Sequence, residues 1–323
     1  MSRKKQKEKT EKAHSEDEAS RNTDEYHCSG NVKIDFPRLC ALLDIKDIPA
    51  VNTKQHISAA PRWSKPRLQI EKENADPHST KNLKISGWKV DEQIARVLQK
   101  ILPSLSRLQR LHFWQAGLTD QTVMSLINTI PLCSNLSFVT LEGNPLPEQS
   151  YHLLLSEDSL LTHLSLRNNR IGDEGARLIG VALSTTRSAN RNLLSLNLSF
   201  NSIGDEGAAH IAQGLRLNRA LLFLSLSNNQ IGDAGAAHLA QTLGDFTLTH
   251  EEVMERRKLL LERAQSVSNV VLNDSDSCQQ VEETVNPLLD HSAQYRDGEL
   301  ILPGNTTLIS LNLAGQTILR HFF

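Results

Sequence analysis

The chain has 323 residues, and its 35 Lys and Arg against 37 Asp and Glu give a formal net charge of -2 at pH 7. This length allows one repeat array or two compact domains, and the near-balance of charge gives no electrostatic reason to expect binding to nucleic acid. Four cysteines without a C-x-x-C pair or a zinc-finger spacing indicate reduced thiols rather than a disulfide framework.

Residues 1–24 are rich in charged and polar residues and contain no apolar core of the kind a secretory signal peptide has. We expect a disordered charged tail, with a nuclear signal or an anionic-surface tether as the alternative that its lysines leave open. No run of eighteen apolar residues occurs, so the sequence predicts no membrane span. A cytoplasmic protein is therefore expected, and a nuclear location stays open.

Residues 25–80 are interpreted as an N-terminal flanking segment that ends in a linker. A helical spacing of apolar residues is present at Phe36, Leu39, Cys40 and Leu43. We expect this helix to cap the first edge of the following array, because an open edge of a repeat stack needs a cover. The polar, Pro-containing stretch from about 59 to 80 is interpreted as the linker.

A repeated pattern, L-x-x-L-x-L-x-x-N-x-[LI], occupies residues 81–247. Four units match it at every fixed position, and their asparagines are Asn144, Asn169, Asn201 and Asn229. Three further units keep the apolar frame but have Trp88, Ala116 or Gln316 in place of the asparagine. The intervals between successive positions of this kind are 28, 28, 25, 32, 28 and 87 residues. A pattern that recurs several times in one chain predicts a repeated architecture and not a catalytic site.

Each fixed position of the repeat has a structural explanation. Alternating leucines predict a short parallel strand with the leucines turned inward, and the asparagine amide is expected to satisfy backbone groups that stacking buries. The Gly-Asp pair that follows predicts a turn, in which Asp173, Asp205 and Asp233 are expected to cap the helix that each precedes. One unit alone cannot cover its apolar face, so stability is expected to come from stacking.

This pattern and its 28-residue period resemble the leucine-rich repeat, in particular the helix-containing class of the ribonuclease inhibitor family. The resemblance implies an α/β fold over residues 81–247. Its architecture is a leucine-rich repeat solenoid, a curved array with parallel strands on the concave inside and helices outside.

The 87-residue interval is interpreted as one repeat plus an insertion at residues 248–285. Thr249 and Glu252 predict a capping box for a charged helix, THEEVMERRKLLLERAQ, which a flexible linker follows. A solvated extension is favoured for this helix over a partner-binding one. Residues 286–323 are interpreted as an incomplete final repeat, because no helix follows its strand. We expect marginal order there and a shortened or alternatively ended chain.

No catalytic or cofactor motif is found. The glycines of GDEGARLIG lack the spacing of a phosphate loop and recur in several units, so a structural turn is the better interpretation. The twelve histidines include no H-E-x-x-H, and Asp274 with Asp276 lacks the glycine and distal glutamate of a calcium loop. We therefore expect no enzymatic activity, no cofactor and no metal site.

Candidate function lies on the solvent-facing strand positions of the concave face, where Ser199 and Ser227 are also placed. Aromatic and Arg side chains are the most frequent anchors of protein interfaces. The candidate partner-binding residues are Trp114, Phe138, Glu142, His163, Arg167, Phe200 and Phe223. The alternative is that the phenylalanines fold over neighbouring units and that Trp114 covers the N-terminal end of the array.

These observations favour a non-enzymatic scaffold that binds a protein partner on the concave strand face. The alternative is a direct regulator of an enzyme, because GTPase-activating proteins and nuclease inhibitors also use repeats of this class. A dense charged cluster on the face would favour the regulator; Glu142 and Arg167 have opposite charges in neighbouring units, so the scaffold is preferred. A ciliary or other cytoskeletal assembly is a further hypothesis.

Overall fold

The computed structural model describes residues 25–53, 66–156, 159–184, 192–271 and 287–316, with the side chains of 266–271 and 287 excepted. The predicted tail, most of the linker in the insertion and the last seven residues lie outside this part. The chain divides into two compact units. The first contains Met1–Ser150 and Leu160–Asn169, and the second contains Tyr151–Ser159 and Arg170–Phe323.

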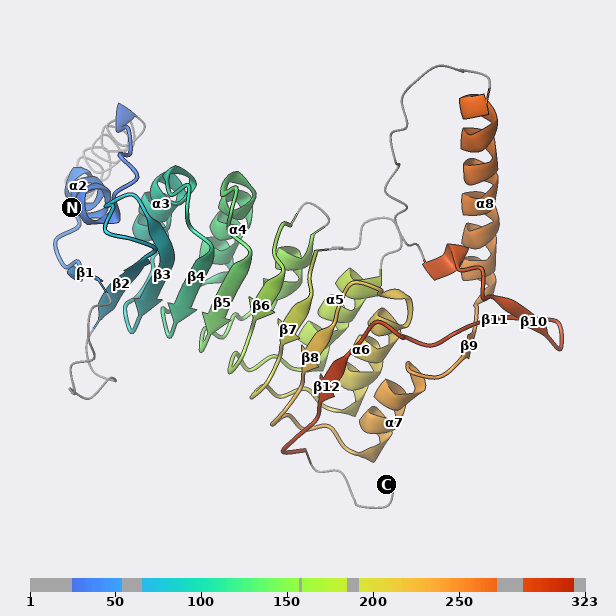
Figure 1. Cartoon of the computed structure of the whole chain (residues 1–323). Coiled ribbons are helices and arrows are strands. Elements are labelled where there is room, and N and C mark those ends of the chain that lie inside the picture. The colour runs from blue at the N-terminus through green and yellow to red at the C-terminus, as the bar shows by residue number, and fades with distance from the viewer. Residues whose placement is uncertain (1–24, 54–65, 157–158, 185–191, 272–286, 317–323) are drawn as a thin grey trace, which may run out of the picture. The chain divides into compact units, whose positions relative to one another are not determined.

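The first unit is a sheet of six strands in chain order, with helices α3 and α4 along one side of it (Figure 1). Strand β2 is antiparallel to β3, and the other neighbouring pairs are parallel. The elements are α2 (Val32–Leu42), β1 (Val51–Thr53), β2 (Arg67–Lys72), β3 (Thr80–Ser86), α3 (Glu92–Ile101), η1 (Leu102–Ser104), β4 (Arg110–Trp114), α4 (Asp120–Thr129), η2 (Ile130–Leu132), β5 (Phe138–Glu142) and β6 (His163–Ser165).

Helix α2, the helix expected to cap the array, buries Phe36, Leu39 and Cys40. Phe36 contacts Trp88 edge to face, with ring centroids 5.9 Å apart. Trp88, at the position where four later repeats have asparagine, thus has a packing partner on α2. The turn before α2 is held by the buried carboxylate of Asp35, which accepts the backbone N–H groups of three preceding residues, at 2.9 to 3.1 Å.

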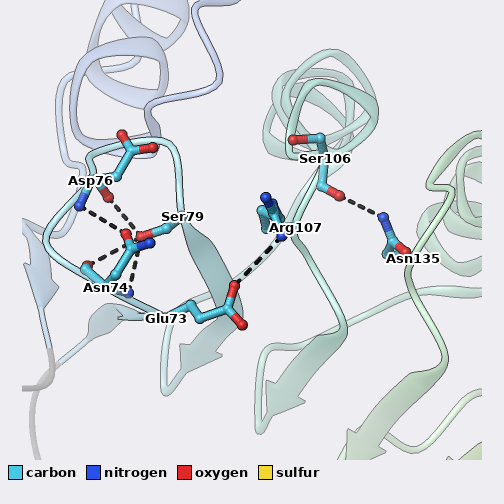
Figure 2. A network of polar contacts seen from close by, with 7 residues as sticks. All are labelled: Glu73, Asn74, Asp76, Ser79, Ser106, Arg107 and Asn135. Atoms are coloured by element: carbon cyan, nitrogen blue, oxygen red, sulfur yellow. Dashed lines mark hydrogen bonds and ion pairs between the residues drawn. The ribbon is translucent and has the colours of Figure 1, made fainter.

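The prediction of a linker at 59–80 is wrong for the second half of this stretch, which contains strand β2. Leu68 and Ile70 alternate with polar residues and are buried, so β2 belongs to the core. The tip of the β2–β3 hairpin is a network of local bonds, in which Ser79 Oγ donates to the carbonyls of Asn74 and Asp76 (Figure 2). The alternation of apolar and polar residues in β2 covers only six residues and has turn-forming residues on both sides, so the sequence alone did not indicate a strand.

The second unit contains three parallel strands of the repeat, in the order β7, β8, β12, and a separate three-stranded sheet, β10-β11-β9. Its elements, with η3 (Ser150–Leu155) before them, are α5 (Asp173–Ser184), β7 (Ser195–Asn197), α6 (Asp205–Leu217), β8 (Phe223–Ser225), α7 (Asp233–Gln241), β9 (Phe246–Thr247), α8 (His250–Val271), η4 (Pro287–Leu289), β10 (Gln294–Arg296), β11 (Glu299–Leu302) and β12 (Ser310–Asn312). The α/β leucine-rich repeat solenoid predicted from the sequence is confirmed in both units.

The repeat asparagines of the first unit join neighbouring repeats through their amide groups. Asn144 Oδ1 accepts the N–H of Ala116 at 2.8 Å, and its Nδ2 donates to the carbonyl of Phe113 at 3.1 Å. Asn169 Oδ1 accepts the N–H of Asn144 at 2.7 Å. Both side chains are buried, so each bond satisfies a backbone group that water cannot reach.

The same bonds occur in the second unit. Asn201 Oδ1 accepts the N–H of Ile171, and Asn229 Oδ1 accepts the N–H of Ile203, both at 3.1 Å. Gln316 Oε1 accepts the N–H of Ile231 at 3.0 Å, so the glutamine of the last unit makes the bond that asparagine makes elsewhere.

A second set of asparagines precedes the strands and was missed from the sequence. Asn218 Oδ1 accepts the N–H groups of Ala220 and Leu221, and Asn305 Oδ1 accepts those of Thr307 and Leu308, all at 2.9 to 3.0 Å. The signal was an asparagine three residues before the first leucine of the repeat. Asn305 therefore marks where the repeat resumes after the insertion.

The helix caps differ from the prediction. Asp173 and Asp205 do not cap their own helices; each accepts N–H groups at the start of the next repeat's helix. Asp173 Oδ1 accepts from Gly204 at 2.7 Å and from Gly207 at 2.9 Å, at the N-terminus of α6. The same contact joins Asp205 to Gly232 and Gly235. A Cβ atom on Gly207 would lie 2.5 Å from the Asp173 oxygen, which explains the second glycine of the G-D-x-G pattern.

Leu248, at the start of the predicted insertion, forms a small core with Leu288, Leu300 and Leu302, which lie after its expected end at residue 285, and Leu217 of α6 packs against this core. The insertion's helix α8 continues to Val271, so the linker expected after residue 265 is helical at its start. The base of α8 is also not simply a solvated extension. Arg216 of α6 forms a largely buried ion pair with Glu252 at 2.6 Å and stacks over the ring of Phe246.

Candidate interaction surface

The outward-facing side chains of strands β2 to β6 form three rows across the first unit. We call this surface the first-unit strand face. Pairing register places neighbouring strands opposite one another residue by residue, so each row crosses the strands. The rows are Glu71, Asn82, Arg110, Phe138 and His163; then Gln69, Lys84, His112, Thr140 and Ser165; then Arg67, Ser86, Trp114 and Glu142. Arg167 follows two residues after Ser165.

The first row contains a continuous stack. The guanidinium of Arg110 lies 4.6 Å from the centre of the Phe138 ring. The ring of His163 stacks on Phe138, with centroids 4.0 Å apart and planes 15° apart. Phe138 and His163, both predicted candidates, therefore lie together. Phe138 contacts Arg110 on the preceding strand and His163 on the following one, which is the kind of contact that the alternative, phenylalanines folding over neighbouring units, expects. The ring is half-buried, and the guanidinium of Arg110 makes a cation–π contact with it.

The two histidines of the face lie in a positive environment. Burial lowers the pKa of His112 below its ordinary value; Lys84 and Arg110 lower it further, while Glu142 and Glu71 oppose them. Burial also lowers the pKa of His163, and Arg110 adds to that shift. Both imidazoles are therefore neutral at pH 7, and His163 Nδ1 lies 2.8 Å from the hydroxyl of Thr162.

The third row brings Trp114 and Glu142 directly opposite each other. Trp114 is half-buried, so part of its ring faces solvent. Glu142 Oε1 accepts a hydrogen bond from Ser165 Oγ at 2.8 Å, which fixes the carboxylate on the face. Arg167 is half-buried in the same unit, and its carbonyl accepts the N–H of Gly143 at 3.1 Å. Five of the predicted candidates thus belong to the first unit.

Two cations of the face, Lys84 and Arg110, were missed from the sequence. Both side chains are exposed, and neither makes a hydrogen bond or ion pair with a residue that the structure describes. Arg110 was missed because β4 begins before the L-x-L part of the repeat pattern, and the signal was the alternation R-L-H-F-W. Lys84 lies inside that part of the pattern, opposite His112, in a unit that matches the pattern only partially.

The outward positions of the second unit differ in chemistry. We call this surface the second-unit strand face; its positions on β7, β8 and β12 are Ser195, Asn197, Phe223, Ser225, Ser310 and Asn312. None of these six residues is charged. The placement of Ser199 and Ser227 on the solvent face is wrong, because both are buried and their hydroxyls bond to each other at 3.0 Å.

Phe223 and Phe200 are the exposed aromatic residues of the second unit's repeat strands and turns, at 44% and 45%. Phe223 begins strand β8 and points outward. Phe200 is not on a strand: it lies in the turn after β7 and has a positive φ of 59°. The residue at this position has positive φ in every repeat, and the set is Gly87, Gln115, Gly143, Asn168, Phe200, Asn228 and Gly315.

No other described cluster suggests chemistry. The structure places no three His, Cys, Asp or Glu side chains of its described residues where they could together hold a metal ion. Burial raises the pKa of the Cys40 thiol to about 12 and that of Cys133 to about 11. Such thiols are protonated at neutral pH and are poor nucleophiles. Among the described helices, α8 included, none combines the length and apolar character that crossing a membrane requires.

Comparison with known proteins identifies the repeats. The family model described as leucine rich repeat matches residues 158–180, 189–212 and 217–240. Among solved structures, a crystal structure of an internalin from Listeria monocytogenes matches with 16% sequence identity and a TM-score of 0.24. That match covers 51% of this chain and 69% of the internalin chain.

Proposed function

We propose that this leucine-rich repeat chain is a non-enzymatic scaffold that binds a protein partner on its strand face. The observation that carries the proposal is the first-unit strand face, where the exposed guanidinium of Arg110 and the half-buried ring of Trp114 lie beside the stacked rings of Phe138 and His163. Leucine-rich repeat arrays present their strand side chains as extended binding surfaces. Aromatic and Arg side chains on such a surface match the composition of interface anchors.

The outward side chains are not needed for the core. In β4 the buried residues are Leu111 and Phe113, and the outward ones alternate with them. The surface is therefore available for recognition without a loss of packing. The candidate contacts are Trp114, Phe138, Glu142, His163 and Arg167 on the first unit, and Phe200 and Phe223 on the second.

The backbone beneath the face is rigid, which favours binding. Asparagine bonds such as Asn144 to Ala116 join each repeat to the next, and strand pairing fixes the rows in register. A preorganised surface loses less conformational entropy on binding than a flexible one does. We propose that partner selection depends on the side chains that differ between repeats, whereas the residues common to them maintain the array.

A narrower relationship is proposed from stretches that the repeat does not dictate. EYHCSG at 25–30, GWKVDEQI at 87–94, LEGNPLPEQSYH at 141–152 and LTHEEVMERRKLLLE at 248–262 resemble leucine-rich repeat-containing protein 71. The resemblance implies an intracellular repeat protein. We propose a cytoplasmic location, with a cytoskeletal or ciliary assembly as the narrower possibility; imaging of the tagged full chain tests both.

Native affinity purification with the full chain, followed by a variant test, addresses the proposal. Trp114→Ala with Arg167→Ala should weaken capture of the partner at least tenfold, because interface anchors of these types contribute about 2 kcal/mol or more each. The matched control is Leu132→Ala with Arg107→Ala, which removes an exposed apolar side chain and an exposed Arg outside the strand face. Circular dichroism verifies that both variants fold.

If the Trp114 and Arg167 variant captures as much partner as the unmodified chain and the control variant do, the strand face is not the binding surface. Recovery of a GTPase or a nuclease whose activity changes on binding would replace the scaffold by the enzyme-regulator alternative.

A further inference from the structure

We propose that the first-unit strand face binds an acidic peptide segment in extended conformation, supplied by the partner. This inference rests on the proposed function and specifies its ligand. It is carried by the arrangement of cations, carboxylates and aromatic rings on the five strands β2 to β6.

The charge of the face is unbalanced. Its cations are Arg67, Lys84, Arg110 and Arg167, and its carboxylates are Glu71 and Glu142. Both carboxylates already accept hydrogen bonds from their own face: Glu71 from Asn82 at 2.7 Å and Glu142 from Ser165 at 2.8 Å. The excess is therefore positive, and two of its cations, Lys84 and Arg110, have no carboxylate partner among the described residues.

Arg110 is positioned to receive a carboxylate. Its Cζ atom lies over the ring of Phe138, 4.6 Å from the ring centre. A guanidinium has five N–H groups in a planar fork, and no described residue accepts a hydrogen bond from those of Arg110, so they are available for bidentate pairing. His163 stacks on the same Phe138 ring, so the ring that Arg110 contacts is packed on its own unit.

The pKa shifts of His112 and His163 are consistent with an excess of positive charge on this face. Lys84 and Arg110 both disfavour the protonated form of His112, and Arg110 does so for His163. Glu142 and Glu71 act on His112 in the opposite direction. An acidic ligand beside Lys84 and Arg110 would reduce this repulsion, so binding should strengthen as the pH falls through the histidine range.

The shape of the face favours an extended segment. Neighbouring strands lie about 4.8 Å apart and alternate outward residues on one strand about 6.8 Å apart. An extended chain places side chains on one side at the same spacing of about 6.8 Å, so successive acidic residues can reach Lys84 and Arg110. Trp114, half-buried in the third row beyond Lys84, offers a surface for an apolar side chain that follows the acidic residues.

A peptide fits this surface better than nucleic acid does. Nucleic-acid interfaces are strongly positive, and this face retains two carboxylates in a chain of net charge -2. The second-unit strand face has no charged residue at its outward positions on β7, β8 and β12, so it offers no cation to a phosphate backbone there.

The test measures fluorescence anisotropy of the full chain with a labelled twelve-residue peptide of repeating Glu-Glu-Leu. We expect binding that the corresponding Gln-Gln-Leu peptide lacks and that weakens as salt rises. Lys84→Glu with Arg110→Glu should weaken it roughly tenfold or more. The matched control, Lys33→Glu with Lys89→Glu, makes the same charge change at exposed positions of the first unit outside the strand face. The neutral pair Lys84→Gln with Arg110→Gln should give an intermediate loss.

Three results would overturn the proposal: no preference for the Glu peptide, equal losses in the strand-face and control variants, or tighter binding of a twelve-nucleotide thymidine oligomer that depends on Lys84 and Arg110. If the partner is still captured and is lost only in the Trp114 and Arg167 variant, the strand face binds a partner but not through acidic residues. That outcome refutes the acidic ligand and leaves the proposed function intact.

Discussion

At the scale of single residues, the turn after each repeat strand imposes one constraint. The residue before the asparagine position has a φ between 47° and 72° in all seven repeats. Glycine and asparagine adopt this conformation readily, and they occupy five of the seven positions. Phe200 and Gln115 are the exceptions. A large aromatic residue held in a left-handed conformation and still 45% exposed is a candidate for function, because strained residues are frequent at functional sites.

Replacement of Phe200 by asparagine is expected to raise the free energy of unfolding by about 1 kcal/mol, because backbone strain is relieved. Chemical denaturation measures this. Phe223→Asn is the control, since Phe223 is equally exposed but begins a strand and has no positive φ. A stability loss in the Phe200 variant would mean that its ring contributes more to packing than its conformation costs.

The histidines predict a pH dependence of stability. Burial and neighbouring cations lower the folded-state pKa of His112 below 6.5, so the unfolded chain binds more protons in this range. Stability is therefore fully present above the unfolded value and is lost as the pH falls below it. Urea denaturation at pH 7.5 and pH 5 should show a smaller decrease for His112→Gln than for the unmodified chain. An identical decrease would exclude His112 as a contributor.

At the scale of elements, the capping aspartates make each helix depend on the repeat before it. Asp173 bonds two N–H groups at the start of α6, whose own N-cap residue, Gly204, has no capping side chain. Asp173→Ala should lower the free energy of unfolding by about 1–2 kcal/mol, because two N–H groups lose their acceptor. The sequence suggested a cap at Asp173 but not its recipient, because both helix starts have the same local pattern.

Glu174→Ala is the matched control in a denaturation experiment. Glu174 is the neighbouring acid, and its ion pair with Arg177 lies on the surface, where such pairs contribute little. Equal effects of the two substitutions would contradict the inter-repeat cap and favour a general preference for acid at a helix start.

At the scale of the whole molecule, the repeat pattern was sufficient to predict the fold class, because the same leucines and asparagines recur in each unit. Structural features that occur in only one repeat or outside the repeats were harder to predict from the sequence. Strand β2 was taken for a linker, since a short alternation such as R-L-Q-I-E-K carries little signal among turn residues. Arg110 was overlooked because β4 begins before the shared pattern, and Lys84 was overlooked because its repeat matches the pattern only partially. Contacts between side chains on neighbouring strands, such as that of Arg110 with Phe138, depend on the pairing register of the two strands, which a single sequence does not specify.

The most direct test of the proposed function is site-specific photo-crosslinking in the full chain under native conditions. A photoreactive amino acid in place of Thr140 lies in the middle row of the first-unit strand face, between His112 and Ser165. The same amino acid in place of Leu132, which is 65% exposed, samples the first unit outside the strand face. We expect a covalent partner adduct at 140 and none at 132. An adduct at 132 alone would show that the partner binds elsewhere than on the strand face.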